Sequence, residues 1–105
     1  FRRLDEVCPE RTILASDTTA LMPSKLASGT KRPDRVLGAH YINPPFLVPL
    51  VEVVPGPETS PETVDTMTRV LRKLGKQPIV VKKEVPGFVA SRLQVALLRE
   101  ALWLV

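Results

Sequence analysis

With 105 residues, the chain has the length of one small domain, and its composition, 44% hydrophobic and 25% charged, is that of a folded protein. The single cysteine, Cys8, excludes a disulfide framework and favours a cytoplasmic or organelle-matrix location, and the single histidine leaves no recognisable metal site. The net charge of +4 is spread along the chain and aromatic residues make up only 5%, so we expect no nucleic-acid partner. Charged residues interrupt the apolar C-terminal run, which falls short of the roughly 20 residues of a membrane span, so we expect no membrane partner either.

A short strand and a hydroxyl-rich turn open the predicted fold. The polar N-terminal residues suit the end of a helix. Residues 11–15 predict a brief buried strand, which leads into the turn Ser16-Asp-Thr-Thr19. Pro23 near the start and Gly29 at the end predict a helix of one to two turns. The polar side chains of the turn therefore gather at the carboxyl end of the first strand.

Two further strands carry the most informative residues of the chain. Residues 36–42 predict the second strand, with His40 near its end, because the following Asn43-Pro-Pro45 cannot continue a ladder of hydrogen bonds. Residues 49–54 predict the third strand, which ends at a Pro-Gly-Pro turn. Glu52 lies inside this apolar strand, and burying its carboxylate is costly unless it meets a hydrogen-bonding partner.

Together, His40 and Glu52 have the chemistry of a general base. The imidazole of histidine ordinarily titrates near pH 6.5, so it can accept a proton close to neutral pH. A hydrogen-bonded carboxylate fixes the tautomer of the imidazole and stabilises the imidazolium that forms. A single histidine among apolar residues is also compatible with a purely structural role. The acidic residue in the third strand favours the catalytic interpretation.

The second half of the chain predicts two helices and a strand. Ser60 as N-cap, Pro61 at the first helical position and apolar residues at helical spacing predict a helix that Gly75 ends. Residues 77–82 predict a fourth strand. Residues 88–105 predict a long helix that is apolar around most of its circumference. Such a helix must be buried, so we expect it to be the first piece of a further domain.

The alternation of strands and helices predicts an α/β fold, with a mostly parallel sheet if the crossovers are helical. In open sheets of this kind, ligands bind outside the carboxyl ends of the strands. The turn at residues 16–19 and His40 both fall there. This edge of the sheet is therefore the predicted site.

Five short motifs follow one another along the chain. They are Ala15-Ser-Asp-Thr-Thr19, Gly38-Ala-His-Tyr-Ile-Asn-Pro44, Leu50-Val-Glu-Val-Val54, Gly75-Lys-Gln-Pro78 and Pro86-Gly-Phe-Val-Ala-Ser-Arg-Leu93. In order and spacing they resemble the NAD-dependent L-3-hydroxyacyl-CoA dehydrogenases, and residues 43–45 and 83–85 are similar to the short-chain (3-hydroxybutyryl-CoA) and lambda-crystallin-like branches. The resemblance implies the second half of a Rossmann-like cofactor domain over residues 1–83. It implies the first long helix of an α-helical C-terminal dimerisation domain over residues 84–105.

The resemblance also implies a reaction, in which an L-3-hydroxyacyl-CoA or a related small 3-hydroxy acid is oxidised to the 3-keto product with NAD. His40 would take the hydroxyl proton, with Glu52 hydrogen-bonded to it. Thr19 stands where the family has a serine that contacts substrate and cofactor. Asn43 matches the family's asparagine beside the nicotinamide and the substrate carbonyl. Ser91 occupies the position of an asparagine that helps to hold the substrate.

Three features depart from the family's pattern. Asp17 replaces an asparagine, and it either places a negative charge near the cofactor or caps a turn. Ser91 has a shorter side chain than the family's asparagine, which puts the usual substrate in question. No two glycines are separated by one residue, so the Gly-x-Gly-x-x-Gly loop that binds the cofactor's pyrophosphate is absent from this sequence. We therefore expect a fragment of an enzyme, inactive alone, whose complete form is a homo-oligomer.

An alternative from another class of protein stays open. The same scaffold also suits a non-enzymatic structural or interaction protein that associates through its apolar C-terminal helix. An intertwined homodimer that covers the bare edge of the sheet is compatible with either function. Cofactor binding and the state of association would separate these hypotheses.

Overall fold

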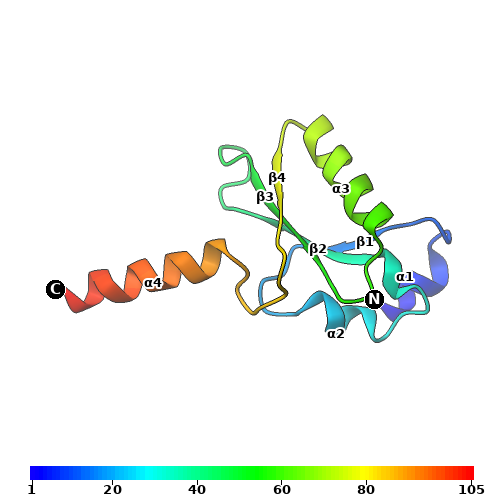
Figure 1. Ribbon diagram of the computed structural model, residues 1–105, viewed down its shortest axis with the longest axis horizontal. Helices are drawn as coiled ribbons and strands as arrows, with labels where there is room; N and C mark the ends of the chain where they lie inside the picture. Colours follow the sequence, from blue (N-terminus) through cyan, green and yellow to red (C-terminus); the bar gives the residue numbers. More distant parts are fainter.

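The fold is built on one four-stranded sheet. The computed structural model describes residues 1–105. Its strands are β1 (Leu14–Ser16), β2 (Val36–Tyr41), β3 (Leu50–Pro55) and β4 (Gln77–Val80), and they lie in that order across the sheet (Figure 1). The pairs β1–β2 and β3–β4 are parallel, whereas β2 and β3 are antiparallel because no helix crosses over between them. The sheet is therefore parallel only where a helix connects its strands.

Five helical segments accompany the sheet. They are α1 (Arg2–Val7), α2 (Pro23–Ala27), the 3-10 turn η1 (Pro33–Arg35), α3 (Pro61–Lys73) and α4 (Ala90–Trp103). Ser60 is the N-cap of α3, as predicted, and its hydroxyl oxygen accepts a hydrogen bond from the Thr63 N–H at 3.2 Å. None of these helices combines the length and the apolar character that a membrane span requires.

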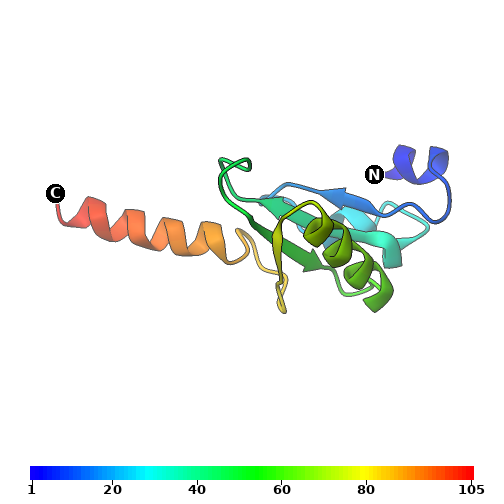
Figure 2. The ribbon, with the colours of Figure 1, turned by 90° about the horizontal axis from the view of Figure 1, so that it is seen from above.

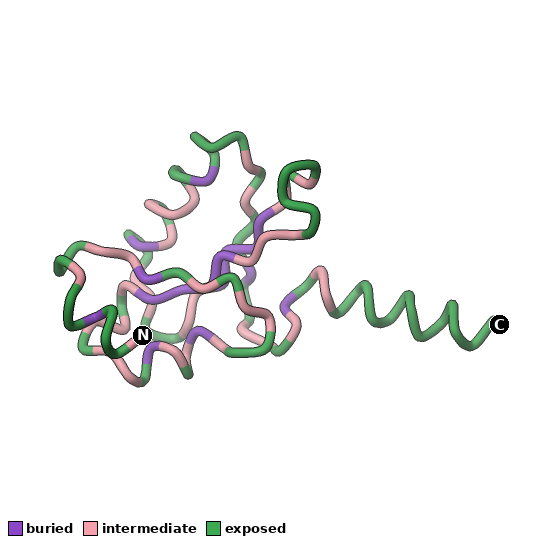
Figure 3. The backbone as a smooth tube through the Cα atoms, turned by 180° about the vertical axis from the view of Figure 1, so that it is seen from behind, coloured by how far each residue is buried: buried purple, intermediate pink, exposed green.

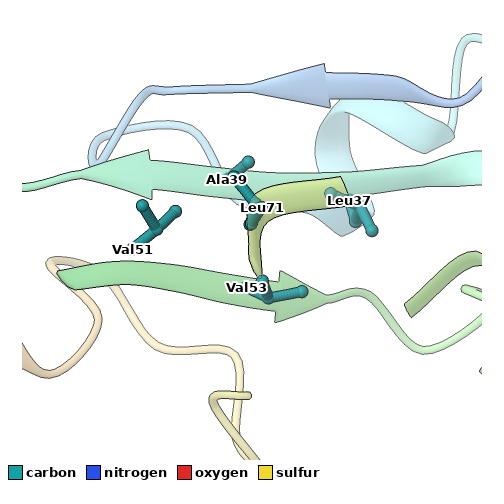
Figure 4. Close-up of a cluster of buried hydrophobic side chains, with 5 residues drawn as sticks. All are labelled: Leu37, Ala39, Val51, Val53 and Leu71. Carbon is teal, nitrogen blue, oxygen red and sulfur yellow. The ribbon is translucent and has the colours of Figure 1, made fainter. Parts of the chain in front are cut away.

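One face of the sheet packs against α3. Because side chains alternate along a strand, Leu37 and Ala39 of β2 point to the same face as Val51 and Val53 of β3. These four side chains are buried together with Leu71 of α3 (Figure 4). This cluster is the largest of the hydrophobic core, and it fixes the orientation of β2 and β3.

The opposite face of the sheet carries the predicted site. Two smaller clusters cover it: one joins β1 and β2 to α2, and the other joins β3 to the segment between β4 and α4. Their buried members are Leu14, Val36 and Ala27 in the first and Val54, Val81 and Phe88 in the second. His40 and Glu52 alternate with the residues that face α3, so both side chains point to this second face.

Several predicted boundaries differ from those of the structure. The strand β2 ends at Tyr41 rather than at residue 42, β3 runs over Leu50–Pro55 rather than 49–54, β4 ends at Val80 rather than at residue 82, and α4 ends at Trp103 rather than at residue 105. Two further differences have a clear structural reason. The first strand begins at Leu14 rather than at residue 11, because its partner strand β2 begins at Val36, directly opposite Leu14. The last helix begins at Ala90 rather than at residue 88. The reason is the backbone of Phe88, whose φ of 46° lies outside the right-handed helical region.

The last helix, α4, projects away from one end of the sheet, while α1 lies near the other end (Figures 1 and 2). None of the 14 residues of α4 is buried (Figure 3). Its large apolar side chains are exposed, among them Leu93, Leu97, Leu102 and Trp103. The burial that we expected for this helix is therefore not found among residues 1–105.

Candidate active site

The centre of the site is a hydrogen bond between a histidine and a fully buried glutamate. The antiparallel register of β2 and β3 places His40 directly opposite Glu52. The Nδ1 atom of His40 lies 2.7 Å from Oε2 of Glu52. The Glu52 side chain is completely buried, whereas that of His40 keeps 13% of its surface exposed. The imidazole thus has one edge against the carboxylate and one edge near the surface.

The second oxygen of Glu52 joins the pair to the start of α4. Its Oε1 atom accepts hydrogen bonds from the backbone N–H groups of Val89 and Ala90, each at 2.9 Å. The buried carboxylate therefore has three polar partners, which offsets the cost of removing it from water. A hydrogen-bonding partner for Glu52 was predicted from the sequence, but these two backbone donors were not.

Phe88 holds the imidazole from another side. Its ring meets the His40 ring edge to face, with the ring centroids 5.8 Å apart and an angle of 61° between the planes. Phe88 is 1% exposed and packs with Val54 and Val81. The sequence contained no separate signal for this contact, because Phe88 was noted only as part of a longer motif.

A cavity of about 440 Å³ opens in front of His40. Thr19 from the β1–α2 loop, Asn43 from the β2–β3 loop and Ser91 from α4 all line it. The structure thus brings the three predicted ligand-binding residues to the predicted base, while Glu52 lies behind His40. Gln94 also lines the cavity and was missed. Its position three residues after Ser91, on the same helix face, was the available signal.

Asp17 connects the ends of two strands. Its Oδ1 atom accepts a hydrogen bond from the Tyr41 N–H at 2.7 Å. The turn after β1 is instead capped by hydroxyls, since Ser16 Oγ accepts from the Thr18 N–H and Thr18 Oγ1 from the Ala20 N–H. The carboxylate therefore fastens β1 to the carboxyl end of β2, next to His40. That it places a charge near the cofactor stays a prediction.

Lys76 holds the loop that carries Asn43. Its ammonium group donates a hydrogen bond to the Pro45 carbonyl and lies 5.8 Å from the centre of the Tyr41 ring. The Gln77 N–H donates to the Pro49 carbonyl at 2.9 Å, which closes the other end of the loop. Residues at the start of β4 thus support the wall of the cavity that Asn43 forms.

These features define a class of protein. A Rossmann-like α/β sheet with a buried histidine–carboxylate pair and polar side chains at the carboxyl ends of β1 and β2 is the arrangement expected of part of an NAD-dependent dehydrogenase. The family described as "3-hydroxyacyl-CoA dehydrogenase, NAD binding domain" matches residues 1–85, and the chain belongs to it. The resemblance drawn from the five motifs, with NAD as the family's cofactor, is confirmed.

Individual proteins from several organisms are similar to the chain. Lambda-crystallin from Oryctolagus cuniculus is 47% identical over 96% of the chain and 32% of its own length. L-carnitine dehydrogenase from Burkholderia mallei (strain ATCC 23344) is 46% identical over 98% of the chain and 32% of its own length. The crystal structure of (S)-3-hydroxybutyryl-CoA dehydrogenase from Ralstonia eutropha superposes with a TM-score of 0.89 at 38% identity, over 95% of this chain and 35% of that one.

The chain spans about one third of the length of these relatives. Within that third, the predicted fold class is confirmed: the sheet matches the Rossmann-like NAD-binding domain, and α4 matches a helix of the C-terminal domain that follows it. The division of the chain at residue 83 and the cytoplasmic location stay predictions.

Proposed function

We propose that the complete protein is an NAD-dependent dehydrogenase that oxidises the 3-hydroxyl of an L-3-hydroxyacyl-CoA, or of a related small 3-hydroxy acid, to a ketone. His40 is the general base and Glu52 orients it. The observation that carries this proposal is the 2.7 Å hydrogen bond between a fully buried carboxylate and an imidazole that borders a cavity. Membership of the 3-hydroxyacyl-CoA dehydrogenase family supports the reaction class.

The hydrogen bond determines which nitrogen of His40 acts as the base. A carboxylate accepts but does not donate, so Nδ1 carries the proton and donates it to Glu52, which leaves the lone pair on Nε2. Nε2 then removes the proton from the substrate hydroxyl as the carbonyl forms. Glu52 stabilises the imidazolium that results. Phe88, against the imidazole ring, limits the positions that the ring can adopt.

The residues at the cavity suit one end of the cofactor. Bound NAD supplies the acceptor for the hydride that leaves the substrate carbon. The Thr19 hydroxyl and the Asn43 amide follow β1 and β2, and both groups can bond to a carboxamide, so we assign the nicotinamide end to them. Ser91, on the α4 side of the cavity, is assigned to the substrate. No Gly-x-Gly-x-x-Gly loop for the pyrophosphate occurs among these 105 residues.

Two substrate classes follow from the relatives. One relative is named for L-carnitine, a free 3-hydroxy acid, and another for a CoA thioester, (S)-3-hydroxybutyryl-CoA. The side chains of Thr19, Asn43, Ser91 and Gln94 make the cavity polar, which suits the carboxylate or thioester carbonyl of either substrate. Experiment must therefore decide the acyl-chain length of the substrate and whether the substrate is linked to CoA.

The experiment is NAD reduction by the complete protein, measured with 3-hydroxybutyryl-CoA and with L-carnitine, against His40→Asn. The asparagine amide can still donate to Glu52, but it cannot take a proton. We expect kcat to fall about 100-fold or more, the usual contribution of a general base, with little change in Tm. Unchanged turnover in the variant would reject His40 as the base. Failure of the wild-type protein to reduce NAD with any 3-hydroxy acid or its CoA ester would reject the reaction.

A second candidate function rests on a different observation, the exposure of α4, none of whose residues is buried. A structural protein on the same scaffold would use this apolar helix to associate with a second copy. We propose that the complete protein is a homo-oligomer under either function. Size-exclusion chromatography with light scattering tests this, and a monodisperse monomer would contradict it. Thermal stabilisation by NAD separates the two functions, because only the dehydrogenase requires NAD binding.

A further inference from the structure

The N-terminus of α2 has no cap of its own. This helix has five residues, its N-cap is Met22, and no local side chain accepts a hydrogen bond from its first N–H groups. The missing acceptor comes from a residue 60 positions later in the chain: Oε1 of Glu84 accepts from the Ser24 N–H at 2.7 Å. A carboxylate at this point also interacts favourably with the positive end of the helix dipole.

The segment that carries Glu84 contacts the site at three further points. It runs between β4 and α4, and in Figure 1 it lies beside the loop that follows β1. The Gly87 N–H donates to the Thr19 carbonyl at 3.2 Å. Phe88 packs against His40, and the next two N–H groups donate to Glu52. One short segment therefore connects the Thr19 loop, the His40–Glu52 pair and the helix that carries Ser91.

The point to which Glu84 is attached is itself firmly packed. Pro23, the first residue of α2, is among the fully buried residues. A Cβ atom added to Gly56 would lie 3.3 Å from the Ser24 nitrogen, so the turn that follows β3 leaves no spare room beside the start of α2. Glu84 thus ties the segment before α4 to a rigid part of the sheet layer.

We propose that Glu84 is a positioning residue that sets the distance between the two walls of the cavity, Thr19 on one side and Ser91 on the other. Glu84 does not line the cavity. It acts through the segment that it anchors, because the hydrogen bonds at Ser24 and Thr19 hold that segment against the β1–α2 loop. The kinetic consequence of this assignment rests on the proposed function, whereas the structural consequence does not.

The test compares three variants of the complete protein: Glu84→Ala, Glu84→Gln and, as a matched control, Glu58→Ala at an exposed turn. Hydrogen exchange is measured over residues 17–24 and 85–90. Loss of a hydrogen bond to a charged acceptor should speed exchange of these amides about tenfold in Glu84→Ala. The amide oxygen of Glu84→Gln can still accept from Ser24, so this variant should restore most of the protection, and Glu58→Ala should leave it unchanged.

Steady-state kinetics provide the second arm. We expect kcat/KM of Glu84→Ala to fall about tenfold, mainly through a higher KM, because loosened walls weaken substrate positioning without removing the base. The glutamine variant should recover most of this loss. If Glu84→Ala matches Glu58→Ala in both exchange and kinetics, or if glutamine rescues neither, the proposal is wrong. A wild-type protein without dehydrogenase activity would reject the proposed function, and hydrogen exchange would still decide the role of Glu84.

Discussion

Asp5 and Glu52 are the two carboxylates that this fold buries, and their partners differ in kind. Asp5 accepts from the Lys31 N–H at 2.6 Å and from Nε of Arg32 at 2.7 Å. The other guanidinium nitrogens of Arg32 donate to backbone carbonyls of the N-terminal segment, including that of Pro9 at 2.8 Å. Every donor around Asp5 is permanent, because neither a guanidinium nor a backbone amide changes its protonation near neutral pH.

Two of the three partners of Glu52 are backbone N–H groups, and a backbone N–H group is also among the partners of Asp5. Its third partner is the imidazole of His40, a side chain with a second ring nitrogen that can bond to a ligand, and that imidazole borders a cavity. Burial and complete hydrogen bonding are thus common to both carboxylates. Under the proposed function, what separates Glu52 from the structural Asp5 is a partner that can exchange a proton with a ligand.

The sharpest test of this difference is the substitution Glu52→Gln. The amide oxygen can still accept from Val89 and Ala90, but the amide nitrogen would donate to Nδ1 of His40. The proton of the imidazole would then move to Nε2, and the base would lose its lone pair. We expect kcat to fall about 100-fold or more, with a smaller loss of stability.

The variant Glu52→Ala removes the acceptor as well as the charge. It leaves two buried N–H groups without partners and a void, so the free energy of unfolding should fall by about 3 kcal/mol or more. Thermal denaturation and NAD reduction, with the exposed Glu62→Gln as control, separate the two effects. Activity of Glu52→Gln equal to that of the control would contradict the assigned tautomer.

A smaller effect, on stability alone, is expected on the other side of the comparison. Arg32→Ala removes the side-chain partner of Asp5 and three hydrogen bonds to backbone carbonyls, so α1 should loosen from the loop before η1. Hydrogen bonds to charged groups contribute about 1.5–3 kcal/mol, and we expect a loss of stability of that order with unchanged kcat. Arg35→Ala, which removes one exposed hydrogen bond to the Arg11 carbonyl, is the matched control. A large loss of kcat in Arg32→Ala would mean that this ion pair also supports the site.

The sequence was informative where contacts are local. The sequence predicted the pair of His40 and Glu52 from its chemistry, because a carboxylate inside an apolar strand needs a hydrogen-bonding partner. The short connection between the two strands brings these residues opposite each other, and alternation puts both on one face. Ser60 and Gly75 mark the two ends of α3. The Ser60 hydroxyl caps the first turn, and Gly75 has the φ of 76° that favours glycine. The motifs at residues 15–19 and 86–93 predicted that Thr19 and Ser91 belong to the same site.

Contacts between distant segments were not predictable in the same way. The bond of Glu84 to Ser24 spans 60 residues, that of Glu52 to Ala90 spans 38 and that of Asp5 to Lys31 spans 26. Each depends on how packed layers bring two loops together, and no spacing in the chain encodes that. In the sequence, Asp5 is only one of several polar residues near the N-terminus, although the fold buries it.

The acid limb of the stability curve gives the last and smallest test of the comparison. The Lys31 N–H, and then the hydrogen bond and charge of Arg32, hold the pKa of Asp5 below its usual value, against the opposing effect of desolvation. Because the folded-state pKa is lower than the unfolded one, the stabilisation is complete above about pH 4 and is lost as the pH falls through the folded-state pKa. Asp5→Asn should therefore be less stable than the wild-type protein at neutral pH, and the two curves should converge in acid.

Urea denaturation at a series of pH values checks this, with Asp65→Asn on an exposed position of α3 as control. Parallel curves for wild-type and Asp5→Asn would mean that the Asp5–Arg32 pair contributes no charge-dependent stability. Convergence in acid for the control as well would attribute the effect to the net charge of the chain.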